Sequence, residues 1–194
     1  PKMPQSSSPP PPTNPLIINL GFHTITTPTS SYPSIITRPH RQLVTMVCSD
    51  HSLVVDKGQL IVERIGERGI VSNAGNARKV ITWVVGKEVQ EGNKGGGRIY
   101  DGIVIMGQEF DWLLPNLYLQ DVLSNVMSMK NVPVSIVSKS TGVGYGRKRF
   151  RIVVDFGYSN TRITGVYEDK VIEGSHVRIG VGGKVVGNWI KEVA

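Results

Sequence analysis

The stretch RIVVDFGYSNTRITGVY, residues 151–167, decides the fold class of this chain. Two runs rich in β-branched and aromatic residues, 151–156 and 161–167, flank the turn Gly157-Tyr158-Ser159-Asn160. Gly and Asn supply the backbone conformations that a tight hairpin turn needs. The segment therefore predicts two antiparallel strands, and the elements on either side of it decide which kind of sheet protein this is.

Helical patterns appear before the hairpin. Residues 76–89 carry apolar side chains at helical spacing: Val80, Ile81, Val84, Val85 and Val89. Residues 116–130, preceded by Pro115, carry a second stripe: Leu119, Val122, Leu123, Val126 and Met127. A buried-type strand, residues 103–106, lies between them. This mixture of strands and helices predicts an α/β fold.

Further strands are predicted at residues 16–21, at 24–27, which would pair with the first, and at 131–137. Pro28, Pro33 and Pro39 predict an irregular stretch to about residue 42, because each proline removes a backbone donor. Residues 43–62 predict a small β-rich insertion, and residues 138–149 a loop rich in Gly and basic residues. A last helix begins near Gly182, and we expect it to pack through Val185, Val186, Trp189 and Ile190.

Composition sets limits on the remaining features. The net charge of +7 favours acidic partners without identifying one. A single cysteine, Cys48, excludes an internal disulfide, and we expect it to be a small buried residue. The apolar runs are too short for a membrane-spanning helix. Residues 1–15 form a Ser/Pro tract that predicts a disordered tail.

Five segments in order resemble the actin family. The first is Tyr32–Gln42, which resembles the family's Pro-Ser, aliphatic pair and Arg-Pro segment. The second is Glu67–Asn73, which resembles the stretch leading into a helix that bears a tryptophan, here Trp83. The others are the Asn131-Val132-Pro133 turn, the strand Arg151–Gly157 with the following Val166-Tyr167-Glu168, and the segment His176–Gly183.

The resemblance covers residues 16–194 and implies an actin-like, RNase H-like fold. It implies a first large lobe over residues 16–150 with a reduced small lobe inserted at about 43–62. Residues 151–194 would begin a second large lobe. Because the last matching segment corresponds to about the midpoint of an actin, we expect this sequence to be the N-terminal half of such a fold.

The resemblance also locates a nucleotide site, and the residues there depart from the family. Actins hold ATP and magnesium between two hairpin loops that use backbone amides and carboxylates. The residual positions here are Asn19 and Gly21 in the first loop and Asp155 and Gly157 in the second. Asn19 replaces one family carboxylate and Tyr158 another.

Three further replacements affect the chemistry. We expect the ring of Phe22 to occupy phosphate space, the lysine that follows it in the family has no counterpart, and Ser140 stands at the position of the glutamine that orients the attacking water. The sequence therefore predicts no catalytic residue and no metal ligand set. His23 as a replacement base and Asp155 as a lone metal ligand remain alternatives, although local hydrogen bonding explains such residues more often.

A basic loop follows the Asn-x-Pro turn. Residues 142–151 combine several glycines with Arg147, Lys148, Arg149 and Arg151. Nucleic acid or an acidic protein could bind there, and an exposed flexible loop is the more common meaning of such a pattern.

These observations predict an actin-related scaffold subunit of a larger assembly, of a cytoskeletal, dynactin-like type or a chromatin-remodelling type, that is not an enzyme. Its expected partners are other subunits, including actin or actin-related proteins, and its expected location is the cytoplasm, with the nucleus as the alternative. An ATP-binding actin-like ATPase with altered phosphate loops and bound magnesium is the competing hypothesis.

Overall fold

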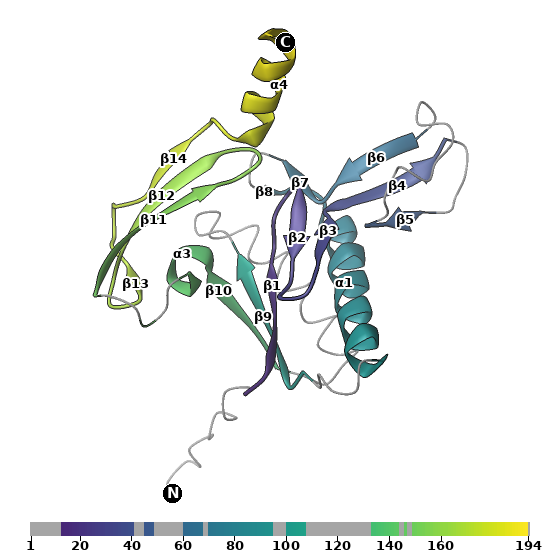
Figure 1. Ribbon diagram of the computed structural model, residues 1–194, viewed down its shortest axis with the longest axis horizontal. Helices are drawn as coiled ribbons and strands as arrows, with labels where there is room; N and C mark the ends of the chain where they lie inside the picture. Colours follow the sequence, from purple (N-terminus) through teal and green to yellow (C-terminus); the bar gives the residue numbers. More distant parts are fainter. Residues whose placement is uncertain are drawn as a thin grey trace, which may run out of the picture.

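The structure is a computed structural model of the 194-residue chain. It describes residues 13–40, 45–48, 60–67, 70–94, 100–107, 133–143, 146 and 149–193. The helix predicted at 116–130 and most of the tail at 1–15 lie outside these ranges. Figure 1 shows two groups of strands, one beside helix α1 and one leading into helix α4, with a smaller sheet beyond α1.

The first group is a five-stranded sheet in the order β10-β9-β1-β2-β3. Strands β1 (Pro15–Asn19), β2 (Thr24–Thr26) and β3 (Ser31–Pro33) form an antiparallel meander. Strands β9 (Gly102–Gly107) and β10 (Val134–Ser138) add on the other side of β1, and both pairings are parallel. This mixed sheet agrees with the actin-like fold that the resemblance implied.

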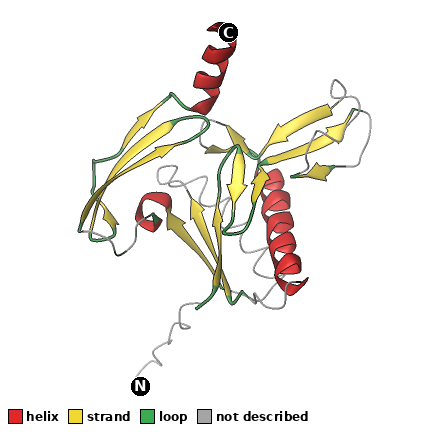
Figure 2. Cartoon of the chain, viewed as in Figure 1, coloured by secondary structure: helices red, strands yellow, loops and turns green. Residues whose placement is uncertain are grey.

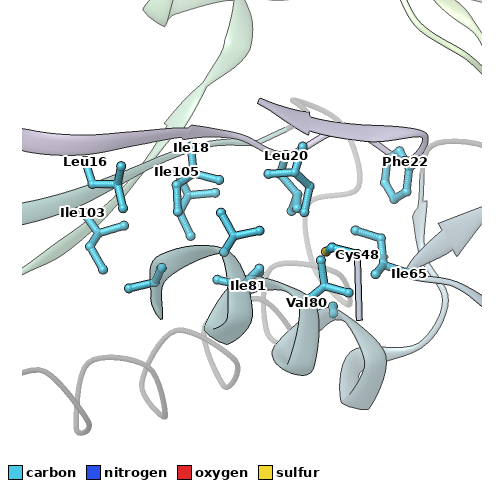
Figure 3. Packing of buried hydrophobic residues seen from close by; sticks show 14 of the residues in the cluster. Leu16, Ile18, Leu20, Phe22, Cys48, Ile65, Val80, Ile81, Ile103 and Ile105 are labelled. Atoms are coloured by element: carbon cyan, nitrogen blue, oxygen red, sulfur yellow. The ribbon is translucent and has the colours of Figure 1, made fainter. Parts of the chain in front are cut away.

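Helix α1 (Ala74–Lys94) covers one face of this sheet. The side-chain Oδ1 of Asn73 accepts a hydrogen bond from the Asn76 backbone N–H at 2.9 Å, which caps the start of the helix. The predicted stripe is confirmed, because Val80, Ile81, Val84 and Val85 are buried and Val89 packs against the same cluster. Figure 3 shows Val80 and Ile81 of this stripe on the side of the helix that faces the buried residues of β1 and β9.

A separate three-stranded sheet, in the order β5-β4-β6, combines strands from the β-rich segment predicted at about 43–62 with β4, which precedes that segment. Its strands are β4 (Ile35–Pro39), β5 (Met46–Val47) and β6 (Leu60–Arg64), and a short pair follows, β7 (Gly66–Glu67) with β8 (Ile70–Val71). The expectation of an irregular stretch after Pro28 was wrong, because β3 and β4 lie within it. Pro33 lies on the edge strand β3, where proline is tolerated, and Pro39 is the last residue of β4.

The second group of strands is an antiparallel sheet in the order β11-β12-β13, with β14 also paired to β12. Its strands are β11 (Phe150–Phe156), β12 (Thr161–Tyr167), β13 (Lys170–Val171) and β14 (Val177–Ile179). The hairpin predicted from residues 151–167 is confirmed, with Phe156 opposite Thr161 next to the turn. In Figure 2 this sheet is set apart from the helix-covered one.

Two predictions for segments near this sheet, one of a loop and one of how a helix packs, were wrong. Part of the loop expected at 138–149 is a short helix, α3 (Lys139–Gly142). Helix α4 (Gly183–Val193) forms near the predicted position but does not pack as expected. Its apolar residues Val185, Val186, Trp189 and Ile190 are all exposed, Trp189 by 64%, and in Figure 1 the helix projects away from the sheets.

Candidate functional site

The candidate site is a pocket between the two hairpins that the resemblance singled out. Its volume is about 280 Å³. The described residues that line it come from the β1–β2 hairpin, from the start of α3, and from the end of β11 and the turn after it: Asn19, Gly21, Phe22, His23, Thr24, Thr26, Lys139 and residues 155–160. All four residual nucleotide positions, Asn19, Gly21, Asp155 and Gly157, therefore lie on one pocket.

Both turns depend on a glycine for their shape. A Cβ added at Gly21 would collide with the carbonyl oxygen of Thr24, and one added at Gly157 would lie 2.8 Å from the carbonyl oxygen of Asn160. Gly157 also donates its backbone N–H to that Asn160 oxygen at 2.9 Å, which closes the second turn. Any larger residue would force these loops open.

Phe22 does not block the pocket in the way we expected. Its side chain is only 8% exposed and belongs to the main hydrophobic cluster. Figure 3 shows the ring on the same side of the sheet as Leu20, directed toward Ile65 and Cys48. The apolar ring gains more from this burial than from lying in a polar loop, and the space between the hairpins stays open.

The acidic side of the pocket is reduced to one group. Asp155 supplies the only carboxylate among the described lining residues, and the Lys139 Nζ lies 3.6 Å from its Oδ2. The side chains are 16% exposed for Lys139 and 33% for Asp155. Sequence reasoning missed Lys139, because no motif marks a lysine on α3 as a neighbour of β11.

Asn19 is the first-loop residue that the resemblance aligns with a family carboxylate. Its Oδ1 is buried and has no hydrogen-bond partner among the described residues. An ionised carboxylate there would need a cation or several donors to offset its desolvation. The amide avoids that charge, so the described part of the first loop offers no ionic ligand to a metal.

His23 joins the two hairpins through an aromatic contact. Its ring lies edge-on to the ring of Tyr158, with centroids 4.4 Å apart, and the Arg64 guanidinium lies 5.1 Å from the centroid of the same tyrosine. Burial, and then the positive charge of Arg64, lower the pKa of His23 below its ordinary value. A neutral imidazole against an aromatic ring is suited to holding the hairpins together, and we see no substrate-activating partner for it among the described residues.

Ser140 is the residue that the resemblance aligns with the family's water-orienting glutamine. It is buried, and its hydroxyl lies 3.4 Å from the Ser138 hydroxyl. It is not one of the residues that line the pocket. A short, buried hydroxyl in this place cannot reach a water molecule beside a phosphate in the way that a longer amide can.

The basic loop is divided by the structure. Arg147 and Lys148 lie outside the described residues. Arg149 is exposed and lies 3.9 Å from Glu168, whereas the Arg151 guanidinium forms a 2.8 Å ion pair with Asp169 and its side chain is only 11% exposed. Arg151 is therefore engaged by Asp169, in a turn of the same sheet. Of the two arginines of this loop that the structure describes, Arg149 and Arg151, only Arg149 is exposed to solvent.

Neither a metal-binding cluster nor a membrane helix is present in the described part of the chain. No group of three or more His, Cys, Asp or Glu side chains could hold a metal ion there. No helix in the same ranges is long and apolar enough to cross a membrane.

Comparison with known proteins agrees with this geometry. The comparison with curated proteins found no match. The family model for actin matches residues 16–194, which includes both hairpins, helix α1 and every described strand except the first residue of β1. A match over this length, together with a mixed α/β fold that has a pocket between two glycine-dependent hairpins, shows that the chain belongs to the actin family.

Proposed function

We propose that this actin-family protein serves as a structural subunit of a larger assembly, and that its nucleotide site does not hydrolyse ATP. The observation that carries this proposal is the Lys139–Asp155 ion pair. The single carboxylate among the described pocket residues is already compensated by an ammonium group. Magnesium-dependent hydrolysis needs carboxylates to order the waters around the metal and a group that orients the attacking water.

The exposed surface supports a role in assembly. Large apolar side chains of β11, β14 and α4 are exposed, including Phe150, Phe156 and Trp189. Apolar patches larger than those of ordinary monomers occur at protein interfaces. We propose other subunits of the assembly, including actin or actin-related proteins, as partners, in a cytoskeletal complex of the dynactin type or in a chromatin-remodelling complex. The cytoplasm is the proposed location, with the nucleus as the alternative.

Phosphate release tests the catalytic part of this proposal. The protein is incubated with ATP and magnesium beside an Asp155→Ala variant, and we expect no turnover above that variant. Loss of one charge-stabilising or positioning group commonly costs about a hundredfold in rate, and several are replaced here. Turnover that the Asp155→Ala variant abolishes would contradict the proposal.

The alternative, an actin-like ATPase with altered phosphate loops, has one observation in its favour. The pocket remains open at about 280 Å³, because Phe22 turns into the core. Titration with ATP and magnesium distinguishes the two. Tight binding accompanied by turnover supports the ATPase, and binding without turnover leaves the structural role in place.

A further inference from the structure

The residues of the pocket do not fit the magnesium ion that the family implies. Magnesium is usually held through one or two carboxylates together with substrate phosphates. Here the described pocket residues offer only Asp155, and a positively charged group already lies 3.6 Å from its oxygen. A divalent cation placed at Asp155 would have to displace that ammonium group and would then be repelled by it.

The position of Lys139 follows from the fold. Strand β10 pairs in parallel with β9 and ends at Ser138, so α3 begins at the edge where the first hairpin turns. Lys139 is the first residue of α3, and it crosses from the first group of strands to β11 of the second. One side chain thus places a positive charge where the two hairpins meet.

Two further cationic side chains lie next to residues that line the pocket. Arg162 lies opposite Asp155 in the β11–β12 register, and opposed residues of an antiparallel pair share a face of the sheet. Arg64 lies against Tyr158, and its Nη1 is buried without a hydrogen-bond partner in the described residues. Of these three cationic side chains Lys139 lines the pocket, whereas Arg64 and Arg162 lie next to the lining residues Tyr158 and Asp155.

We propose that the Lys139 ammonium takes the place of the metal ion, so that this pocket binds a di- or triphosphate group without a divalent cation. The proposal rests on the assignment of the pocket as a degenerate nucleotide site. The ammonium is a point charge with three donors, which suits phosphate oxygens. Gly21 and Gly157 line the pocket, and each keeps its turn tight because a Cβ there would collide with the backbone of the same turn.

Isothermal titration with inorganic tripolyphosphate tests the proposal, once with magnesium and once with EDTA. We expect a Kd in EDTA equal to or tighter than the Kd in magnesium, because the metal competes for the same phosphate oxygens. Lys139→Ala should weaken binding in EDTA at least about tenfold, and Lys139→Arg should retain most of it. The matched control is Lys191→Ala, an exposed lysine on α4, which should leave the Kd unchanged.

In the Lys139→Ala variant we expect magnesium to have the opposite effect on phosphate binding. Removal of the ammonium leaves Asp155 without this cation, so residual binding should become tighter when magnesium is added. That gain of metal dependence separates a lysine that replaces the metal from one that only supports the fold. Circular dichroism of each variant confirms that it is folded.

A second arm uses ATP in place of tripolyphosphate. Tighter binding of ATP identifies a nucleotide as the source of the phosphate group, and equal binding identifies free polyphosphate. Either result supports the proposal if magnesium is not required. Binding that magnesium strengthens tenfold in the unmodified protein, no change in Lys139→Ala, or no binding of either probe would overturn it. Each of those outcomes is distinct from failure of the proposed function, because the absence of ATP hydrolysis is tested separately by phosphate release.

Discussion

The helix-covered sheet and the β11–β14 sheet both contain alternating apolar residues, but these residues are buried in the first sheet and exposed in the second. In β1, Leu16 and Ile18 point into a closed cluster beneath α1. In β11 the alternation is reversed, since Phe150, Ile152, Val154 and Phe156 are exposed while Arg151 and Asp155 are half-buried. An alternating apolar pattern therefore fixes which residues share a face, whereas burial depends on what covers that face.

The largest expected effect is the difference in reactivity between the thiol of Cys48, in the covered hydrophobic cluster, and a thiol placed on the exposed face of β11. Burial raises the pKa of Cys48 to about 12, so the reactive thiolate fraction at pH 8 is about 10⁻⁴. We expect thiol–disulfide exchange of the folded protein to be about a thousandfold slower than that of an ordinary exposed thiol. The measurement is the rate of reaction with a chromogenic disulfide reagent.

A cysteine moved to the other sheet provides the control. Val154→Cys in a Cys48→Ser background places the thiol on the exposed face of β11 and should react at the ordinary rate. Equal rates for the two proteins would contradict the burial difference between the sheets.

Matched isoleucines test packing in the same way. Ile105 of β9 is fully buried, and Ile152 of β11 is 65% exposed. Ile105→Ala should lower the free energy of unfolding by about 3 kcal/mol, because it removes buried methyl groups and leaves a cavity. Ile152→Ala should change it by less than about 0.5 kcal/mol. Urea denaturation measures both, and a large loss in Ile152→Ala would show that the β11 face is covered.

A buried carboxylate strengthens the first region. Glu88 of α1 is 2% exposed and accepts hydrogen bonds from the hydroxyls of Thr27 and Thr29, each at 2.6 Å, and of Tyr32 at 2.9 Å. These bonds attach the β2–β3 turn to the helix. Glu88→Gln should lower the free energy of unfolding by about 2 kcal/mol, because charge-assisted bonds become neutral ones.

The equivalent change on α4 is the control for that measurement. Glu192→Gln, at an exposed position of α4, should have no measurable effect on unfolding. Equal losses in the two variants would mean that the polar cluster around Glu88 adds nothing to the stability of the covered sheet.

The smallest expected effect is on the pH dependence of stability, and it comes from His23, which contacts Tyr158 between the two regions. Because the pKa of His23 is lowered in the folded protein, the unfolded chain binds more protons between that lowered value and the ordinary value of 6.5. The free energy of unfolding should therefore rise with pH through this window and fall as the pH drops below 6.5. His23→Asn should flatten the dependence, and Arg64→Met should reduce it. Urea unfolding between about pH 5 and 7 measures the slope, and an unchanged slope in both variants would disprove the role of this contact.

Much of the architecture could be predicted from local pattern. The β11–β12 hairpin, the apolar stripe of α1 and the buried strand β9 each have a period or a turn that one segment specifies. The order of short actin-like segments predicted the family, which the family model confirms over residues 16–194. The two hairpins at the pocket followed from the same segments, because their glycines are required by the turns themselves.

Other features depended on residues far apart in the chain. The sequence determined that Phe22 is apolar, that Lys139 is a cation and that α4 has an apolar stripe, because these are properties of single residues and of their spacing. Only the tertiary structure decided that the Phe22 side chain is buried in the main hydrophobic cluster, that Lys139 reaches Asp155 and that the α4 stripe is exposed. The physical reason is that burial and ion pairing are set by neighbours across the fold, and a linear pattern does not name those neighbours.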